Sequence, residues 1–146
     1  MKLTSPAFSQ EEQIPDEYTC QGKNISPPLA IFDIPETARS LALIVSDPDA
    51  LSGNWTHWLV WNIPVWTKEI LEDSLPEEAV VGVNDFKKTE YGGPCPPSET
   101  HRYIFKILAL DKILDLEPGA SREELEEAME EHVVDSAELV GLCSKE

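Results

Sequence analysis

The chain has 146 residues, a formal net charge of -17 at pH 7 and 41% apolar residues. This length fits one domain, which we expect to span residues 1–146 and to fold without disulfides or a metal, because a chain of this size buries roughly 70% of its unfolded surface. The negative charge repels phosphates, so it argues against nucleic acid as a partner and against stable association with an anionic membrane.

Three cysteines, Cys20, Cys95 and Cys143, stand far apart in the sequence without a CxxC pair. An odd number at such spacings indicates neither a disulfide framework nor a zinc site. The first twenty residues lack the apolar stretch of a signal peptide, and no apolar run reaches the roughly 20 residues that span a bilayer. We therefore expect a cytoplasmic protein with reduced thiols.

Most of the chain predicts β-structure. The N-terminal third reads as short extended pieces joined by turns, since its consecutive prolines exclude a helix. The predicted strands, in chain order, are 30–32, 40–47, 55–63, 79–83 and 101–111. The strand over 40–47 is almost continuously apolar, which is typical of a strand covered on both faces.

Helical patterns begin only after residue 119. Ser121 and Glu124 have the spacing of a capping box, and apolar residues at helical intervals follow, so a helix starts there. The acidic residues around it predict a solvated face. A second short helix is predicted over about 135–142. Many strands followed by helices predict a mainly β fold, β-rich α+β, with an antiparallel sheet and short C-terminal helices.

Polar residues stand at the ends of the three strongest strands. Asp47 ends the first of them, and Asp49 follows after Pro48, so a period-two backbone points both carboxylates the same way. His57 lies near the start of the second strand and His101 at the start of the third. Structural roles are the alternatives: Asp49 as the cap of its own turn, and His57 as a hydrogen-bonded residue on an apolar face.

A stiff loop precedes the third strand. Gly92 and Gly93 permit unusual backbone angles, and three prolines then restrict the chain. If the three strands are neighbours, the aspartate and the two histidines converge beside this loop. A nearby carboxylate stabilises a protonated imidazole, which can hold a small anion together with glycine N–H groups. A simple hairpin connection is the alternative. The expected rim residues are Trp55, Trp58 and Tyr91.

Five short motifs cover nearly the whole chain in a fixed order. They read SDPDA, WTHWLVWNIP, GVNDF, YGGPCPP and HRYIFKILALD. This set resembles the phosphatidylethanolamine-binding protein family, and most closely its bacterial and archaeal Raf kinase inhibitor-like branch. The resemblance implies a β-sandwich-like fold around a central antiparallel sheet, with a small cavity for anionic groups such as phosphate or a phospholipid head group. Leu51 departs from the family pattern, which usually has proline there.

Carried onto this chain, the resemblance implies a set of ligand-binding residues: Asp47, Asp49, His57, Tyr91, Gly93, Pro94, Pro96 and His101. It implies a non-enzymatic protein that binds a small phosphate-like or carboxylate anion without a metal or other cofactor. A regulator that docks on a kinase or a protease through the same pocket is a second hypothesis. Whether the acidic helices cover a homodimer interface or face water is left open.

The third hypothesis is a hydrolase that uses the same pocket. Two histidines and a carboxylate are the ligand types of many hydrolytic metal sites. Alternatively, Cys95 could act as a nucleophile activated by a nearby histidine. The family resemblance implies no required metal. The position of Cys95 between two prolines favours a small buried residue instead. We therefore expect a binding protein rather than an enzyme.

Overall fold

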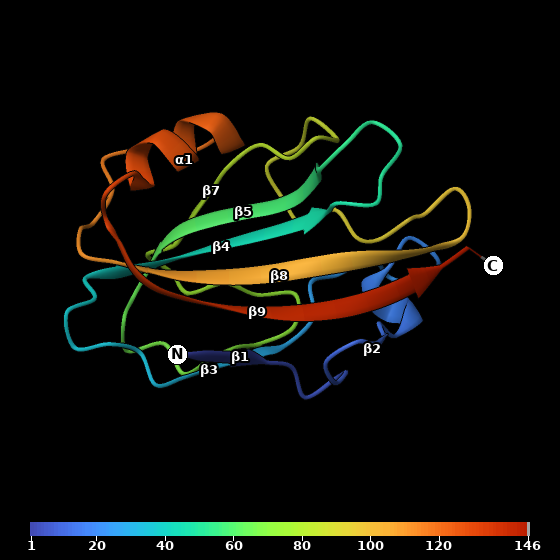
Figure 1. The fold of residues 1–146 in the computed structure, drawn as a ribbon, viewed down its shortest axis with the longest axis horizontal. Helices are drawn as coiled ribbons and strands as arrows, with labels where there is room; N and C mark the ends of the chain where they lie inside the picture. Colours follow the sequence, from blue (N-terminus) through green and yellow to red (C-terminus); the bar gives the residue numbers. More distant parts are fainter. Residues whose placement is uncertain (146) are drawn as a thin grey trace.

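The structure is a computed structural model that describes residues 1–145 and arranges its strands in two sheets (Figure 1). The smaller sheet has the order β1 (Lys2–Thr4), β3 (Leu29–Phe32) and β6 (Glu69–Ile70). The larger sheet has the order β2 (Glu12–Gln13), β9 (Val133–Ser144), β8 (Thr100–Leu110), β4 (Ser40–Asp47), β5 (Trp55–Ile63) and β7 (Val80–Val81). The helices are the 3-10 turn η1 (Asp16–Tyr18) and α1 (Arg122–Met129). Every strand pair except β2–β9 is antiparallel, so the prediction of a mainly β, antiparallel fold is confirmed.

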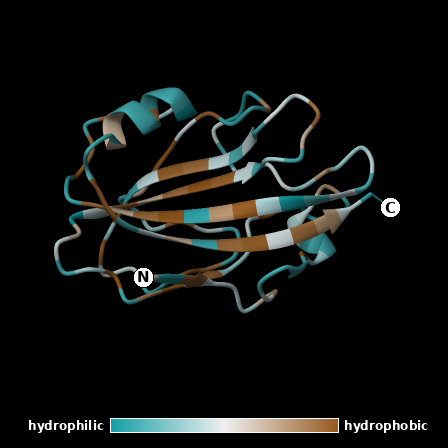
Figure 2. Ribbon diagram, viewed as in Figure 1, coloured by the Kyte–Doolittle hydropathy of each residue, from teal (hydrophilic) through white to brown (hydrophobic). Residues whose placement is uncertain are grey.

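The central strand β4 contributes to two hydrophobic cores. Leu41, Leu43 and Val45 pack into the core between the two sheets, whereas Ala42 and Ile44 pack into a second core beneath α1. All of these side chains are buried, which explains the unbroken apolar pattern of this strand. Figure 2 shows the apolar runs of the central strands and the hydrophilic character of α1.

Helix α1 begins where the capping box predicts. The Ser121 hydroxyl accepts the backbone N–H of Glu124, and the Glu124 carboxylate accepts the backbone N–H of Ser121. Leu125 and Met129 then bury the inner face of the helix against the larger sheet. Between residues 1 and 145, no helix has the length and apolarity that crossing a membrane requires.

The predicted second helix over 135–142 is wrong, because these residues belong to β9. This strand pairs with β8 along nearly its whole length, and every second residue over 139–143 is buried. At Gly141 an added Cβ would lie 2.5 Å from Cγ1 of Ile14, so the strand packs closely against the N-terminal segment. Pairing and burial with period two override a weak helical spacing that already contains a glycine.

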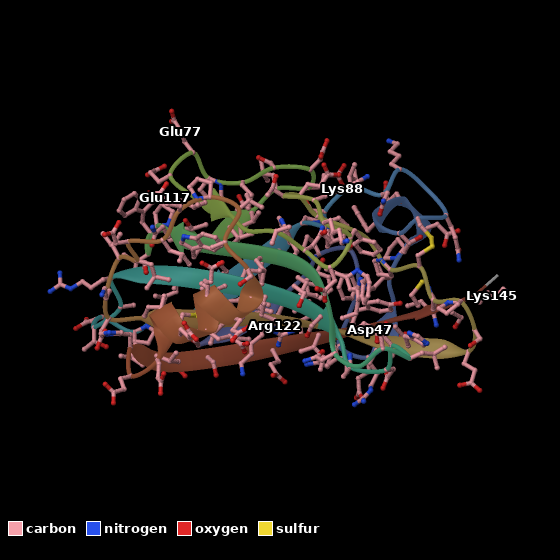
Figure 3. The ribbon with its side chains drawn as sticks, turned by 90° about the horizontal axis from the view of Figure 1, so that it is seen from above. Asp47, Glu77, Lys88, Glu117, Arg122 and Lys145 are labelled. Atoms are coloured by element: carbon pink, nitrogen blue, oxygen red, sulfur yellow. A yellow bond between two sulfur atoms is a disulfide. The ribbon has the colours of Figure 1, made fainter. Side chains whose placement is uncertain are left out.

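The expectation of reduced cysteines is also wrong for two of the three residues. Cys20 and Cys95 form a disulfide across a sequence separation of 75, with their Cα atoms 5.4 Å apart (Figure 3). Both residues are exposed, so Cys95 is not the small buried residue that its neighbouring prolines suggested. Cys143 is buried in β9. The disulfide ties the segment after η1 to the proline loop before β8.

Candidate functional site

A cavity of about 370 Å³ lies where the central strands of the larger sheet end. Asp47 is the last residue of β4, Trp55 is the first residue of β5, and His101 is the second residue of β8. Because β4 is antiparallel to both neighbours, these three positions meet at one end of the sheet. His57 lines the same cavity. We call it the histidine cavity. Figure 3 shows Asp47 in the half of the molecule that also carries the disulfide.

His101 is held by a buried carboxylate. Its Nδ1–H donates to Asp47 Oδ2 at 2.7 Å, and both side chains are buried. The other carboxylate oxygen, Asp47 Oδ1, accepts the backbone N–H of Asp49 at 2.8 Å. The ring of His101 is therefore fixed in orientation, and Nε2 is the nitrogen that can meet a ligand.

His57 is anchored in the same way, but to a backbone carbonyl. Its Nδ1–H donates to the Gly92 oxygen at 2.6 Å. Burial lowers the pKa of His57 below its ordinary value, although the Gly92 carbonyl and the Asp47 charge act in the opposite direction. The ring is therefore neutral at pH 7, and its Nε2 is a hydrogen-bond acceptor.

Aromatic rings enclose the two imidazoles. The centroid of the Tyr103 ring lies 5.2 Å from the centroid of the His57 ring and 6.4 Å from that of the His101 ring. Burial, and then the Asp47 charge, raise the pKa of Tyr103, so its hydroxyl stays neutral. The walls are largely apolar. They include Leu51, Trp55, Phe86, Pro96, Pro97 and Tyr103.

Four of the eight predicted site residues line the cavity, namely Asp47, His57, Pro96 and His101. The other four, namely Asp49, Tyr91, Gly93 and Pro94, do not line it.

Asp49 faces Arg102 instead of the cavity. Its two carboxylate oxygens accept hydrogen bonds from Nε and Nη2 of Arg102 and from the Arg102 backbone N–H, at 2.9–3.0 Å. The guanidinium bonds, followed by the backbone bond, lower the pKa of Asp49 to about 2. The period-two expectation fails here because the chain turns directly after Asp47. Asp49 thus clamps the exit of β4 to the start of β8, beside the Asp47–His101 pair.

Tyr91 is buried beneath the proline loop rather than placed at the rim. Its hydroxyl donates to the Tyr18 carbonyl at 2.7 Å, and its ring meets the Trp58 ring edge-on at 5.3 Å. Trp58 itself belongs to the core between the sheets. Of the three expected rim residues, only Trp55 lines the cavity.

The backbone N–H groups of the glycine loop are bound within the protein. Gly92 N–H donates to the His57 carbonyl at 3.0 Å, and Gly93 N–H donates to Asn24 Oδ1 at 2.9 Å. The Pro94 carbonyl accepts a backbone bond from the N-terminal segment. The expected cradle of glycine N–H groups for an anion is therefore absent at Gly92 and Gly93, and the loop serves to hold His57 and the cavity wall.

Sequence reasoning missed two aromatic residues of the site. The period-two alternation of a strand indicates Tyr103, because it stands two residues after His101 and so faces the same side of the sheet. Phe86 follows the strand β7 by several residues and carries no periodic signal. Only the GVNDF motif, in which it is the last residue, singled out its surroundings.

The hydrolase hypothesis loses its proposed thiol nucleophile, because the Cys95 sulfur is bonded to Cys20. The metal-dependent form lacks a ligand set within residues 1–145, where no three His, Cys, Asp or Glu side chains are placed to hold a metal ion.

Comparison with known proteins identifies the family. A sequence profile of the phosphatidylethanolamine-binding protein family matches residues 4–144. A UPF0098 protein of Methanothermobacter thermautotrophicus is 52% identical over an alignment of 147 positions that covers 97% of each chain. A solved structure described as a phosphatidylethanolamine-binding protein homolog from Chlamydia trachomatis superposes with a TM-score of 0.95 at 43% identity, covering 99% of this chain and 97% of the other. Escherichia coli YbcL, described as a member of the mammalian family, gives 0.93 at 30% identity, covering 99% and 98%. The chain therefore belongs to the phosphatidylethanolamine-binding protein family.

Proposed function

We propose that the histidine cavity binds, without transforming it, a small phosphate-like monoanion held between Nε2 of His57 and Nε2 of His101. One observation carries this proposal: each ring uses Nδ1 to hold a fixed internal acceptor while lining the same cavity. Within residues 1–145, neither Nε2 has a hydrogen-bond partner. Two preoriented nitrogens facing one hollow suit a ligand with several oxygen atoms.

The two histidines call for different partners on the ligand. Neutral His57 offers a lone pair, so it accepts a bond from a ligand oxygen that carries a proton. His101 donates its Nδ1–H to the Asp47 carboxylate, and in its doubly protonated form its Nε2–H donates to a charged oxygen of the ligand. The monoanion of a phosphate monoester supplies both a P–OH donor and charged acceptor oxygens.

The dimensions and walls of the cavity restrict the rest of the ligand. Its volume of about 370 Å³ lies at the lower end of ligand pockets, which run from about 300 to 1,000 Å³. The apolar walls favour an ester with a small organic group. A few charge-assisted bonds, each contributing roughly 1.5–3 kcal/mol, leave micromolar to millimolar affinity after the costs of association.

Methyl phosphate should bind more weakly as the pH rises. The second pKa of a phosphate ester is about 6, so the monoanion falls from about half of the ester at pH 6 to about 1% at pH 8. The P–OH donor for His57 disappears with it, and the affinity should fall about 50-fold over this range. Titration calorimetry at the two pH values measures the change.

Methyl sulfate is the matched control ligand, because it has the shape and charge of the methyl phosphate monoanion without its proton. It should bind more weakly than methyl phosphate at pH 6.

The variant His57→Phe keeps an aromatic ring but removes both nitrogens, and should weaken methyl phosphate binding about tenfold or more at pH 6. His132→Phe, at a histidine paired with Asp111 outside the cavity lining, should change nothing. Equal affinities for wild type and His57→Phe, or no binding by wild type at millimolar ligand, would refute the proposal.

A further inference from the structure

The histidine cavity shares a wall with a second hollow. This hollow has a volume of about 320 Å³, and its polar lining includes Asn24, Asn84, Lys88 and Glu90. We call it the asparagine hollow. Two residues, Phe86 and Cys95, line both spaces. Figure 3 shows Lys88 and Asp47, one from each lining, in the same half of the molecule.

The two residues of the shared wall, Cys95 and Phe86, differ in how freely their side chains can move. Cys95 is fixed by its disulfide to Cys20. The Phe86 side chain is 40% exposed and belongs to neither hydrophobic core. On the side of the histidine cavity its ring meets the rings of Trp55 at 5.6 Å and His57 at 5.3 Å, both edge-on.

The backbone beneath Phe86 is firmly held, so movement is confined to the side chain. Asn84 Oδ1 accepts the backbone N–H groups of both Phe86 and Lys88, and the Asn84 backbone bonds to Lys88 and Lys87 close the same turn. The ring itself rests on Gly92, where an added Cβ would lie 2.5 Å from Phe86 Cδ2. A rotation of one side chain would join the two spaces without unfolding the turn.

We propose that the Phe86 side chain is a movable partition, and that its rotation lets the site take phosphate esters of polyols whose chain extends into the asparagine hollow. The inference rests on the proposed function, since the phosphate end of such a ligand occupies the histidine cavity. The hollow suits a hydroxylated chain because the Asn24 amide and the Lys88 ammonium donate hydrogen bonds and the Glu90 carboxylate accepts them.

The test compares a short and a long ester, methyl phosphate and sorbitol 6-phosphate, by calorimetry at pH 6. In wild type the long ester binds only when Phe86 is rotated, a state populated at about 0.1–10%. Phe86→Ala removes that requirement, so the affinity for sorbitol 6-phosphate should rise about tenfold or more, while that for methyl phosphate should not rise. The long ester alone should also shift the amide NMR signals of Asn24 and Lys88.

Gly92→Ala provides a second variant, because the new Cβ displaces the ring without removing it, and it should also favour the long ester. Phe32→Ala is the matched control, since Phe32 is a 49% exposed aromatic residue outside both linings. Absence of methyl phosphate binding to wild type overturns the proposed function and this inference with it. Normal binding of methyl phosphate, with equal sorbitol 6-phosphate affinity in Phe86→Ala and Phe32→Ala, overturns the partition alone.

Discussion

Replacing both members of the Cys20–Cys95 disulfide by serine should lower the free energy of unfolding by about 4 kcal/mol. The bond closes a loop with a sequence separation of 75, and a cross-link of that size removes roughly this much entropy from the unfolded chain. Both residues are exposed, so serine at either position leaves no cavity. For a chain of this length the midpoint of thermal unfolding should fall by about 10 °C.

A reductant provides the internal control for this experiment. Dithiothreitol should lower the unfolding midpoint of the wild-type protein to that of the double serine variant and should leave the variant unchanged. The native fold should persist in both, because Cys20 N–H still donates to the Pro94 carbonyl and Tyr91 to the Tyr18 carbonyl. If reduced and oxidised wild type unfold at the same midpoint, the disulfide does not contribute to stability.

The fold could be predicted where one strand carries its own signal. β4 and β5 fall on their predicted ranges because a long apolar run has few alternatives to a buried strand. β9 was missed because its first half, residues 133–138, has no buried residue, and because its signal depends on pairing with β8, which no local pattern contains. The disulfide was missed for a similar reason, as its two residues are brought together only by the tertiary fold.

In the candidate site, too, the residues with a strong local signal could be predicted, and those placed by tertiary contacts could not. Asp47 and His101 could be brought together from the sequence, because each stands at the end of a strong strand and neighbouring antiparallel strands share ends. Asp49 and Gly93 could not be placed, since the direction of a loop residue depends on its partners, here Arg102 and Asn24. Phe86 lies in a turn whose course is set by side-chain hydrogen bonds of Asn84, which leave no periodic pattern.

The buried Asp47–His101 pair should give the second large effect on stability. His101→Leu leaves the Asp47 carboxylate buried without its partner, and breaking a buried pair in this way costs about 3–5 kcal/mol. Adding Asp47→Asn removes the unpaired charge and keeps an oxygen for the Asp49 N–H. The double variant should therefore be more stable than His101→Leu alone, by about 1 kcal/mol or more in urea unfolding.

A second His–Asp pair of similar geometry shows how much of the stability loss is due to burial and how much to the contact itself. His132 Nδ1 lies 2.8 Å from Asp111 Oδ1, close to the 2.7 Å of the Asp47–His101 pair, but its side chains are 36% and 45% exposed against 8% and 5% for His101 and Asp47. Water replaces the lost partner at the exposed pair, so His132→Leu should cost less than about 1 kcal/mol. If both leucine variants lose the same stability, or if Asp47→Asn destabilises His101→Leu further, an unpaired buried charge is not the source of the loss. The two pairs differ mainly in access to water, so the difference between the variants measures what desolvation adds at the site.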